Sequence, residues 1–266
     1  MIPYESSLMT LRFTGPNLKE SGIAIYDLGI ILICIQRAIN KASLARTGRL
    51  YKGAIATREH RQEISLQLGS RQKSSDCYGL IPVVSGPELI DTIHYCAKLL
   101  FDSLFAYATG KVLDKLLNER SKEAQTATSS MYNDVSSIVG RIDHRGSIHG
   151  IEIGMPTINY DNIISFDIET RYNIEALNAE YFLGEAITIK ASVFKLYPNM
   201  DMVTVRKSTH GKCNIFLSEK DFRKIRYDRK PGRIISFIGR PRHRLGADLS
   251  DYSEFEANHI SFSAHP

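Results

Sequence analysis

The C-terminal part of the chain alternates apolar and polar residues, as half-buried β-strands do. The predicted strands are residues 187–194, 202–206, 213–217, 233–238 and 253–262. Between the third and the fourth, residues 218–221 read Ser-Glu-Lys-Asp, a capping box that predicts a short helix. Three strands, one helix and two strands is the order of a five-stranded Greek-key barrel of the OB type. We therefore predict an OB-like β-barrel domain over residues 185–266.

The preceding residues, 1–184, mix helical and strand periods and predict an α+β domain with two long helices. The first helix is expected from Leu28 to about Arg46, after Asp27 as a capping residue and before Gly48. Its first half is almost wholly apolar, which predicts a helix that is buried on several sides.

The second long helix is expected over residues 87–118 and begins with Pro87, which suits the first helical turn. One of its faces is apolar along the whole length, and Phe101 and Phe105 widen that face. The residues of the apolar face are Leu89, Ile93, Ala97, Leu100, Leu104 and Ala108. An amphipathic helix of this kind packs in a core or against another protein molecule.

Shorter elements fill the rest of this domain. Strands are expected at residues 8–14, 51–57, 63–68, 78–84, 147–154 and 163–168, and a short helix at 131–140. Residues 119–130 are polar, and we interpret them as a frayed helix end or a flexible link. Residues 170–183 have no clear period, although their apolar positions fit one face of a helix.

The most apolar part of the second helix, residues 95–108, is interrupted by Lys98 and Asp102. Each such charge costs about 3 kcal/mol at the centre of a bilayer, so we expect packing against protein and no membrane insertion. The N-terminal residues lack the basic start and apolar core of a signal peptide, and a cytoplasmic protein is expected.

The cysteines are widely spaced and form no CxxC pair, which argues against a structural zinc site. They are Cys34, Cys77, Cys96 and Cys213. We expect buried free thiols, as is usual for cysteines in a reducing compartment.

The barrel domain also carries most of the basic charge. Thirteen lysines and arginines and three acidic residues lie between Arg206 and Arg244, in a chain whose net charge is +5. A basic block of this kind attracts polyanions through phosphate neutralisation and counterion release. The alternative interpretation is a solvated surface that keeps the domain soluble.

Single-stranded nucleic acid binds to OB-type barrels by stacking its bases on exposed aromatic residues between cations. Tyr197 and Tyr227 lie in loop-like settings beside cations, whereas Phe194, Phe216 and Phe237 are expected in the core. The predicted nucleic-acid contacts are Arg206, Lys207, Lys212, Arg223, Arg226, Tyr227, Arg229, Lys230, Arg240, Arg242 and Arg244.

Residues 240–244, Arg-Pro-Arg-His-Arg, follow the fourth predicted strand of the barrel. Pro241 lacks the backbone donor that a regular ladder needs, so this segment is expected to be the loop between the fourth and fifth strands. In OB-type barrels that loop flanks the ligand-binding face, where the three arginines would contact phosphates.

Catalytic motifs are missing from the sequence: it contains no HExxH, GxSxG, GxGxxG or P-loop pattern. The densest polar cluster is Asp143-His144-Arg145 with His149 and Glu152, which could hold a metal ion or act as a general base. A turn that leads into a strand is the competing interpretation. We expect no cofactor and no metal.

A second candidate is Asp167 with Glu169, which would point the same way from a strand and could hold a divalent cation. No glutamate followed two residues later by lysine supports a nuclease.

Several segments together resemble uncharacterised bacterial proteins, some of them associated with mobile elements or phage-defence loci. The segments are residues 11–15, 25–28, 218–222 and 239–242. The resemblance implies an accessory protein of a bacterial defence system, and it implies no activity and no residue roles.

Taken together, the sequence predicts a non-catalytic module that contacts nucleic acid, single-stranded or without sequence preference, through the basic barrel. One alternative is a protein-interaction subunit that forms a homo-oligomer or docks on a partner through helix 87–118. The other is a metal-dependent hydrolase with its site near residues 143–152.

Overall fold

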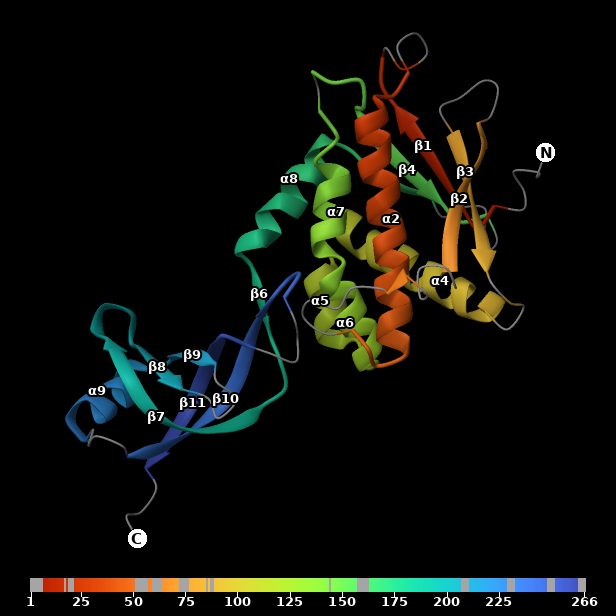
Figure 1. The fold of residues 1–266 in the computed structure, drawn as a ribbon. Helices are drawn as coiled ribbons and strands as arrows, with labels where there is room; N and C mark the ends of the chain where they lie inside the picture. The colour runs from red at the N-terminus through yellow and green to blue at the C-terminus, as the bar shows by residue number, and fades with distance from the viewer. Residues whose placement is uncertain are drawn as a thin grey trace. The chain divides into compact units, whose positions relative to one another are not determined.

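The chain divides into two compact units, residues 1–180 and 181–266. Figure 1 shows their helices and strands. The computed structural model describes residues 7–16, 18, 22–50, 57–58, 64–71, 77–84, 86, 89–143, 145–156, 163–206, 211–228, 233–247 and 252–262. The strand expected at 51–57 and the start of the helix expected at 87 lie outside the described residues, apart from Thr57, which is in no strand.

The first unit contains an antiparallel five-stranded sheet in the order β2-β3-β1-β4-β5. The strands are β1 (Met9–Thr14), β2 (Ile64–Arg71), β3 (Cys77–Val84), β4 (Gly150–Gly154) and β5 (Ile163–Phe166). Side chains alternate between a buried and an exposed face of this sheet: Leu11 and Phe13 of β1 are buried, whereas Arg12 between them is exposed. The buried face packs against helices, because α4 contacts β3 and β5, and α2 contacts β2.

The helices of this unit are α2 (Ile25–Arg46), α4 (Ile90–Ala108), α5 (Val112–Asn118), α6 (Lys122–Ser130), α7 (Tyr132–Val139) and α8 (Ile168–Ala176). α2 packs against α4, α6 and α7. It begins earlier than expected, with Ala24 in the capping position and Asp27 inside the first turn. Its end at Gly48 is confirmed: Gly48 has φ +66° and Arg49 N donates to Leu44 O at 2.8 Å, which is a Schellman motif.

The single helix expected over residues 87–118 is wrong, because the structure has two helices there, α4 and α5. Gly110 adopts φ +71°, and Lys111 N donates to Ala106 O at 2.9 Å, so a Schellman motif ends α4. The buried face is confirmed for Leu100 and Leu104, which are 1% and 0% exposed. Phe105 does not belong to it, since this side chain is 52% exposed.

Residues 122–130, which were interpreted as part of a frayed helix end or a flexible link, form a separate helix, α6. Ser121 caps the helix, with its side chain accepting from Ala124 N at 3.1 Å. Small side chains such as Ala127 and Thr128 are fully buried here. Their size lets α6 pack against α2, and this tertiary packing outweighs the weak helix propensity of Thr and Ser.

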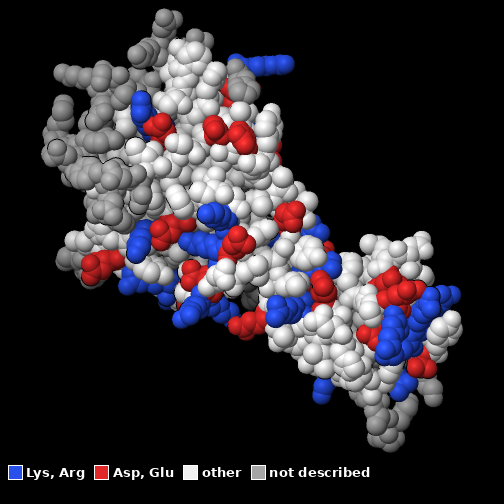
Figure 2. Space-filling model, turned by 180° about the vertical axis from the view of Figure 1, so that it is seen from behind, with Lys and Arg blue, Asp and Glu red and all other residues white. Residues whose placement is uncertain are grey.

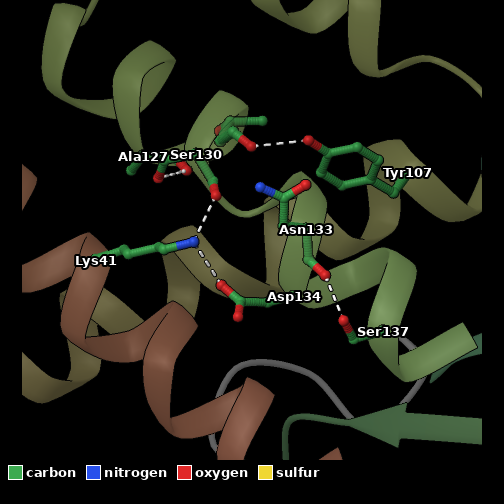
Figure 3. A network of polar contacts seen from close by, with 8 residues as sticks. Lys41, Tyr107, Ala127, Ser130, Asn133, Asp134 and Ser137 are labelled. Atoms are coloured by element: carbon green, nitrogen blue, oxygen red, sulfur yellow. Dashed lines mark hydrogen bonds and ion pairs between the residues drawn. The ribbon is translucent and has the colours of Figure 1, made fainter. Parts of the chain in front are cut away.

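A buried polar network ties these helices together (Figure 3). Lys41 Nζ on α2 donates to Ser130 O at 2.6 Å and to Asp134 Oδ2 on α7 at 2.7 Å. Tyr107 of α4 donates its hydroxyl to Thr128 O of α6 at 2.9 Å, and burial raises the pKa of Tyr107. The network satisfies polar groups that would be costly to bury alone.

By length and apolar composition, α2 is the one described helix that could cross a membrane. Of the residues in its most apolar window, 56% are buried within the protein. Core helices that are mostly buried meet the same criterion, so α2 carries no membrane assignment. The free cysteines of the described chain are all buried, as the sequence predicted: Cys34, Cys77, Cys96 and Cys213.

The second unit is a closed five-stranded mixed barrel, which confirms the α+β class and the OB-like barrel expected from the sequence. Its strands are β7 (Ile187–Tyr197), β8 (Met202–Arg206), β9 (Lys212–Phe216), β10 (Ile234–Arg244) and β11 (Glu254–Phe262), and helix α9 (Glu219–Asp228) lies between β9 and β10 in sequence. The pairing runs β7-β8-β9-β11-β10 and returns to β7. Among the described strand pairs of the barrel, only β9 and β11 are parallel.

The interior of the barrel is filled by inward residues of all five strands and by two residues of α9, Phe222 and Ile225. A sixth strand, β6 (Tyr181–Leu183), pairs with the end of β10. The barrel domain was expected to begin at residue 185, whereas the compact unit begins at Tyr181.

The loop expected at residues 240–244 is wrong, because these residues continue strand β10. The register shift opposite Ile238 and Gly239 puts the extra residue on β11, so it does not interrupt β10. On the other side of β10, β6 ends at Leu183 opposite Arg242, and proline is tolerated where a neighbouring strand ends. Pro241 lies opposite Phe255 of β11, and its carbonyl accepts from Gly184 N at 2.9 Å. The ladder therefore continues on both sides of a residue that cannot donate.

We predict that Leu104→Ala lowers the free energy of unfolding by about 2–5 kcal/mol, because it leaves a cavity under α4. Phe105→Ala is the matched control on the same helix, and it should change that free energy by less than about 0.5 kcal/mol. Denaturant unfolding followed by helical circular dichroism measures both. Equal effects of the two variants would contradict the burial described for α4.

Candidate nucleic-acid interface

The outer face of strands β7, β8 and β9 carries the candidate site. Val203 and Val205 of β8 are buried inside the barrel, opposite inward residues of β9. Because side chains alternate along a strand, the residues between them point outward. These outward residues are Thr204, Arg206, Lys212 and Asn214.

A β-bulge in β7 adds two neighbouring side chains to this face. Val193 pairs with Val205 and Lys195 pairs with Thr204, so Phe194 is the extra residue of the bulge. Bulges break the alternation and re-aim side chains, and here Phe194 and Lys195 are both exposed. Phe194 keeps 49% of its surface exposed, which is unusual for a phenylalanine in a barrel.

These side chains surround a groove of about 420 Å³, which we call the β7–β9 groove. It is lined by Phe194, Lys195, Tyr197, Thr204, Lys212, Asn214 and Ser253. Ser253 precedes β11, and its carbonyl accepts from Asn214 N at 2.8 Å, which holds this edge of the groove in place.

Cations lie against the aromatic rings of the groove. The guanidinium carbon of Arg206 is 4.8 Å from the ring centroid of Phe194, and Lys212 Nζ is 5.4 Å from the same centroid. Lys195 Nζ is 4.5 Å from the ring centroid of Tyr197. These are cation–π distances, and they leave the charges at the surface, where an anion can reach them.

The pKa of Tyr197 is lowered from its ordinary value of 10.0. The largest cause is a hydrogen bond with Lys195, which outweighs the opposing effect of burial, and the charges of Lys195 and Lys212 act in the same direction as this bond. Positive charge that favours a phenolate favours any other anion in the same place. The groove is therefore chemically suited to phosphate.

Two predicted contact residues, Arg206 and Lys212, lie in or beside the groove, and Tyr197, which the sequence offered as an aromatic beside cations, lines it. Lys207, Arg229 and Lys230 lie outside the described residues. Lys195, Asn214 and Ser253 were not expected in the site, and Phe194 was expected in the core. That placement is wrong.

The predicted contacts Arg223, Arg226 and Tyr227 lie on α9, and none of them lines the groove. Tyr227 is 80% exposed. Acidic neighbours offset much of the positive charge of this helix: Arg223 pairs with Glu219, and Lys224 Nζ lies 2.9 Å from Asp221 Oδ1. Figure 2 shows basic and acidic side chains intermingled over α9, which makes the helix a mixed surface.

The predicted contacts Arg240, Arg242 and Arg244 are on β10, and two of them have carboxylate partners on β11. Arg242 Nη2 lies 3.0 Å from Glu256 Oε2, and Arg244 Nη2 lies 3.3 Å from Glu254 Oε1.

Arg242 is also packed between two aromatic rings. Its guanidinium carbon lies 4.0 Å from the ring centroid of Phe216 and 4.4 Å from that of Tyr181. Phe216 is therefore on the outer face, contrary to expectation, whereas Phe237 is buried as expected. Through these contacts Arg242 holds β6 against the barrel, which is a structural role.

The polar residues expected near 143–152 do not converge among the described residues. Asp143 Oδ1 accepts from Arg145 N at 3.0 Å within a turn, and Glu152 Oε2 pairs with Arg12 at 3.1 Å on the sheet. His144 lies outside the described residues.

Asp167 was expected on a strand, but it is the capping residue of α8. Its Oδ1 accepts from Thr170 N at 2.8 Å. Across the described ranges, no group of three or more His, Cys, Asp or Glu residues could hold a metal ion.

The apolar helix face that was considered for docking on a partner is occupied within its own unit. Leu100 and Leu104 are buried there. An interaction through α4 would have to use its other, mostly polar face.

Comparisons with protein-family models, with curated proteins and with solved structures found no match for this chain.

We predict that Tyr197 ionises at lower pH than an ordinary tyrosine. It is neutral below its pKa and anionic above it, and the ammonium of Lys195 favours the anion. The near-ultraviolet absorbance of phenolate, followed against pH, should lose its earliest-titrating component in Tyr197→Phe. In Lys195→Met the same component should move to higher pH. Identical curves for the wild type and Tyr197→Phe would contradict the electrostatics described for the groove.

Proposed function

We propose that this protein is a non-catalytic nucleic-acid-binding module and that the β7–β9 groove holds a single strand. The observation that supports the proposal is the convergence of Lys195, Arg206 and Lys212 around the exposed ring of Phe194. Arg206 and Lys212 lie on the second and third strands of an OB-type barrel, the face with which such barrels bind oligonucleotides and oligosaccharides, and Phe194 and Lys195 lie beside them on the first strand. The three cations favour the polyanion of these two ligand classes.

The availability of the charges also supports this choice. No carboxylate of the described residues forms an ion pair with Lys195, Arg206 or Lys212. By contrast, Arg223, Arg242 and Arg244 each have a carboxylate partner. A cation without a competing carboxylate contributes fully to phosphate binding and counterion release.

The aromatic surface supports a single strand over a duplex. Proteins that bind single strands combine a cationic groove with aromatic side chains on which bases stack. In a duplex the bases are already stacked and paired, so Phe194 would find no base face to contact. Binding of phosphates alone requires cations and does not require an exposed phenylalanine.

We predict that the double change Arg206→Ala with Lys212→Ala weakens binding to a single-stranded oligonucleotide. Each phosphate contact on a single strand contributes about 0.7 to the slope of log affinity against log salt, so the slope should fall in magnitude by about 1.4. Fluorescence anisotropy of a labelled oligonucleotide over a salt series measures this slope. Melting temperatures of both proteins show whether the fold is kept.

The matched control is Lys220→Ala with Arg226→Ala, which removes the same charge from the exposed side of α9. This variant should keep most of the affinity and nearly the full salt slope. Equal losses in the two double variants would show that net charge, and not the groove, binds the strand. A wild-type protein that binds no nucleic acid at low salt would refute the proposed function.

A further inference from the structure

We infer that the β7–β9 groove is a pocket for one unpaired nucleobase and that Asn214 reads the edge of this base, with guanine preferred over adenine. This inference rests on the proposed function and deepens it, since phosphate binding alone requires no base.

The bulge in β7 supplies the stacking surface. It turns Phe194 and Lys195 to the same side of the strand, so an aromatic face and a cation stand next to each other at one end of the groove. Stacking of a base on an aromatic side chain contributes strongly to single-strand binding and accepts every base, because every base has a π-face. Phe194 explains why a base would enter, but not which one.

The size of the groove fits a single base with part of its sugar. Its volume of about 420 Å³ lies in the range of small-ligand pockets, about 300–1,000 Å³. The groove lies on the outer face of the closed barrel, so the remaining nucleotides of a bound oligonucleotide can continue past it on either side.

The amide nitrogen of Asn214 and the ammonium groups of Lys195 and Lys212 give the groove donors, whereas the hydroxyls of Tyr197 and Ser253 can donate or accept. Thr204 Oγ1 donates to Asn214 Oδ1 at 2.8 Å, and Thr204 itself is buried, so this bond fixes the orientation of the Asn214 amide. The amide nitrogen of Asn214 keeps its two N–H donors for a ligand. The ammonium groups of Lys195 and Lys212 donate as well and cannot accept.

The N–H donors of Asn214, with the ammonium groups beside them, favour a base edge with adjacent acceptors. Guanine presents N7 and O6, which are both acceptors, whereas adenine presents N7 as an acceptor and its N6 amino group as a donor. The N6 group would face the N–H donors of Asn214 where O6 of guanine would accept from them. Since the two purines have nearly the same size and stacking surface, they form a matched pair that isolates this difference.

The test uses oligonucleotides with abasic sugars at every position except one, which carries guanine, adenine or no base. Their phosphates are identical, and the single base fixes the register. For the wild-type protein we expect the guanine strand to bind most tightly, about fivefold or more above the adenine strand, the lower end of what a good bidentate contact gives. The adenine strand should in turn bind more tightly than the fully abasic strand.

Two variants assign the effect to residues. Asn214→Ser should bring the ratio of the affinities for the guanine strand and the adenine strand close to one. Phe194→Leu should bring both one-base strands down toward the abasic strand. Circular dichroism of each variant confirms the fold.

The outcomes separate the inference from the function on which it rests. Equal binding of all three strands by the wild type would overturn the base pocket and leave the phosphate-binding function standing. Adenine bound as tightly as guanine, or a guanine preference that survives in Asn214→Ser, would overturn the assignment of Asn214. If no strand binds at low salt, the proposed function fails and the inference fails with it.

Discussion

Closure of the barrel is the constraint on which the site depends. β11 runs parallel to β9 and antiparallel to β10, and these pairings join the ends of the sheet. The join is tight: a Cβ on Gly239 would lie 2.0 Å from the carbonyl oxygen of Glu256, so only glycine fits between β10 and β11. A closed barrel has a single inside, and this fixes which residues of β8 and β9 fill the core and which face solvent. Thr204 and Asn214 point outward for this reason.

Charge in this chain is distributed differently in space than in sequence. The basic run from Arg206 to Arg244 predicts one cationic patch, but α9 and β11 bring acidic residues back to it. Glu219 pairs with Arg223, and Glu256 pairs with Arg242. The groove instead combines Arg206 and Lys212 with a lysine from outside the run, in β7. The basic run in the sequence therefore indicated the domain that contains the groove, but only two of the three cations that surround it.

The sequence predicted the order of elements well and their ends less well. Alternation and capping signals located every strand of the barrel and its helix, because a half-buried strand must alternate. Gly48 was interpreted correctly as a helix end, while Gly110 was passed over, although both form Schellman motifs with positive φ. The apolar residues on both sides of Gly110 made one helix look continuous. Pro241 misled in the opposite direction, since the end of the short strand β6 beside it, where proline is tolerated, has no signature in the sequence.

The neighbourhood of Phe194 in the groove also depends on a local irregularity that the sequence pattern does not predict. Alternation from the buried residues Ile189 and Ala191 already places Phe194 on the outside, but only the bulge puts Lys195 beside it.

The most direct test of the central claim is the change in backbone amide NMR signals of the full chain during titration with a short single-stranded oligonucleotide. The account predicts shifts concentrated at residues 194–197, 204–206, 212–214 and 253, with α9 largely unchanged. Shifts centred on α9, or spread evenly over the barrel, would contradict it.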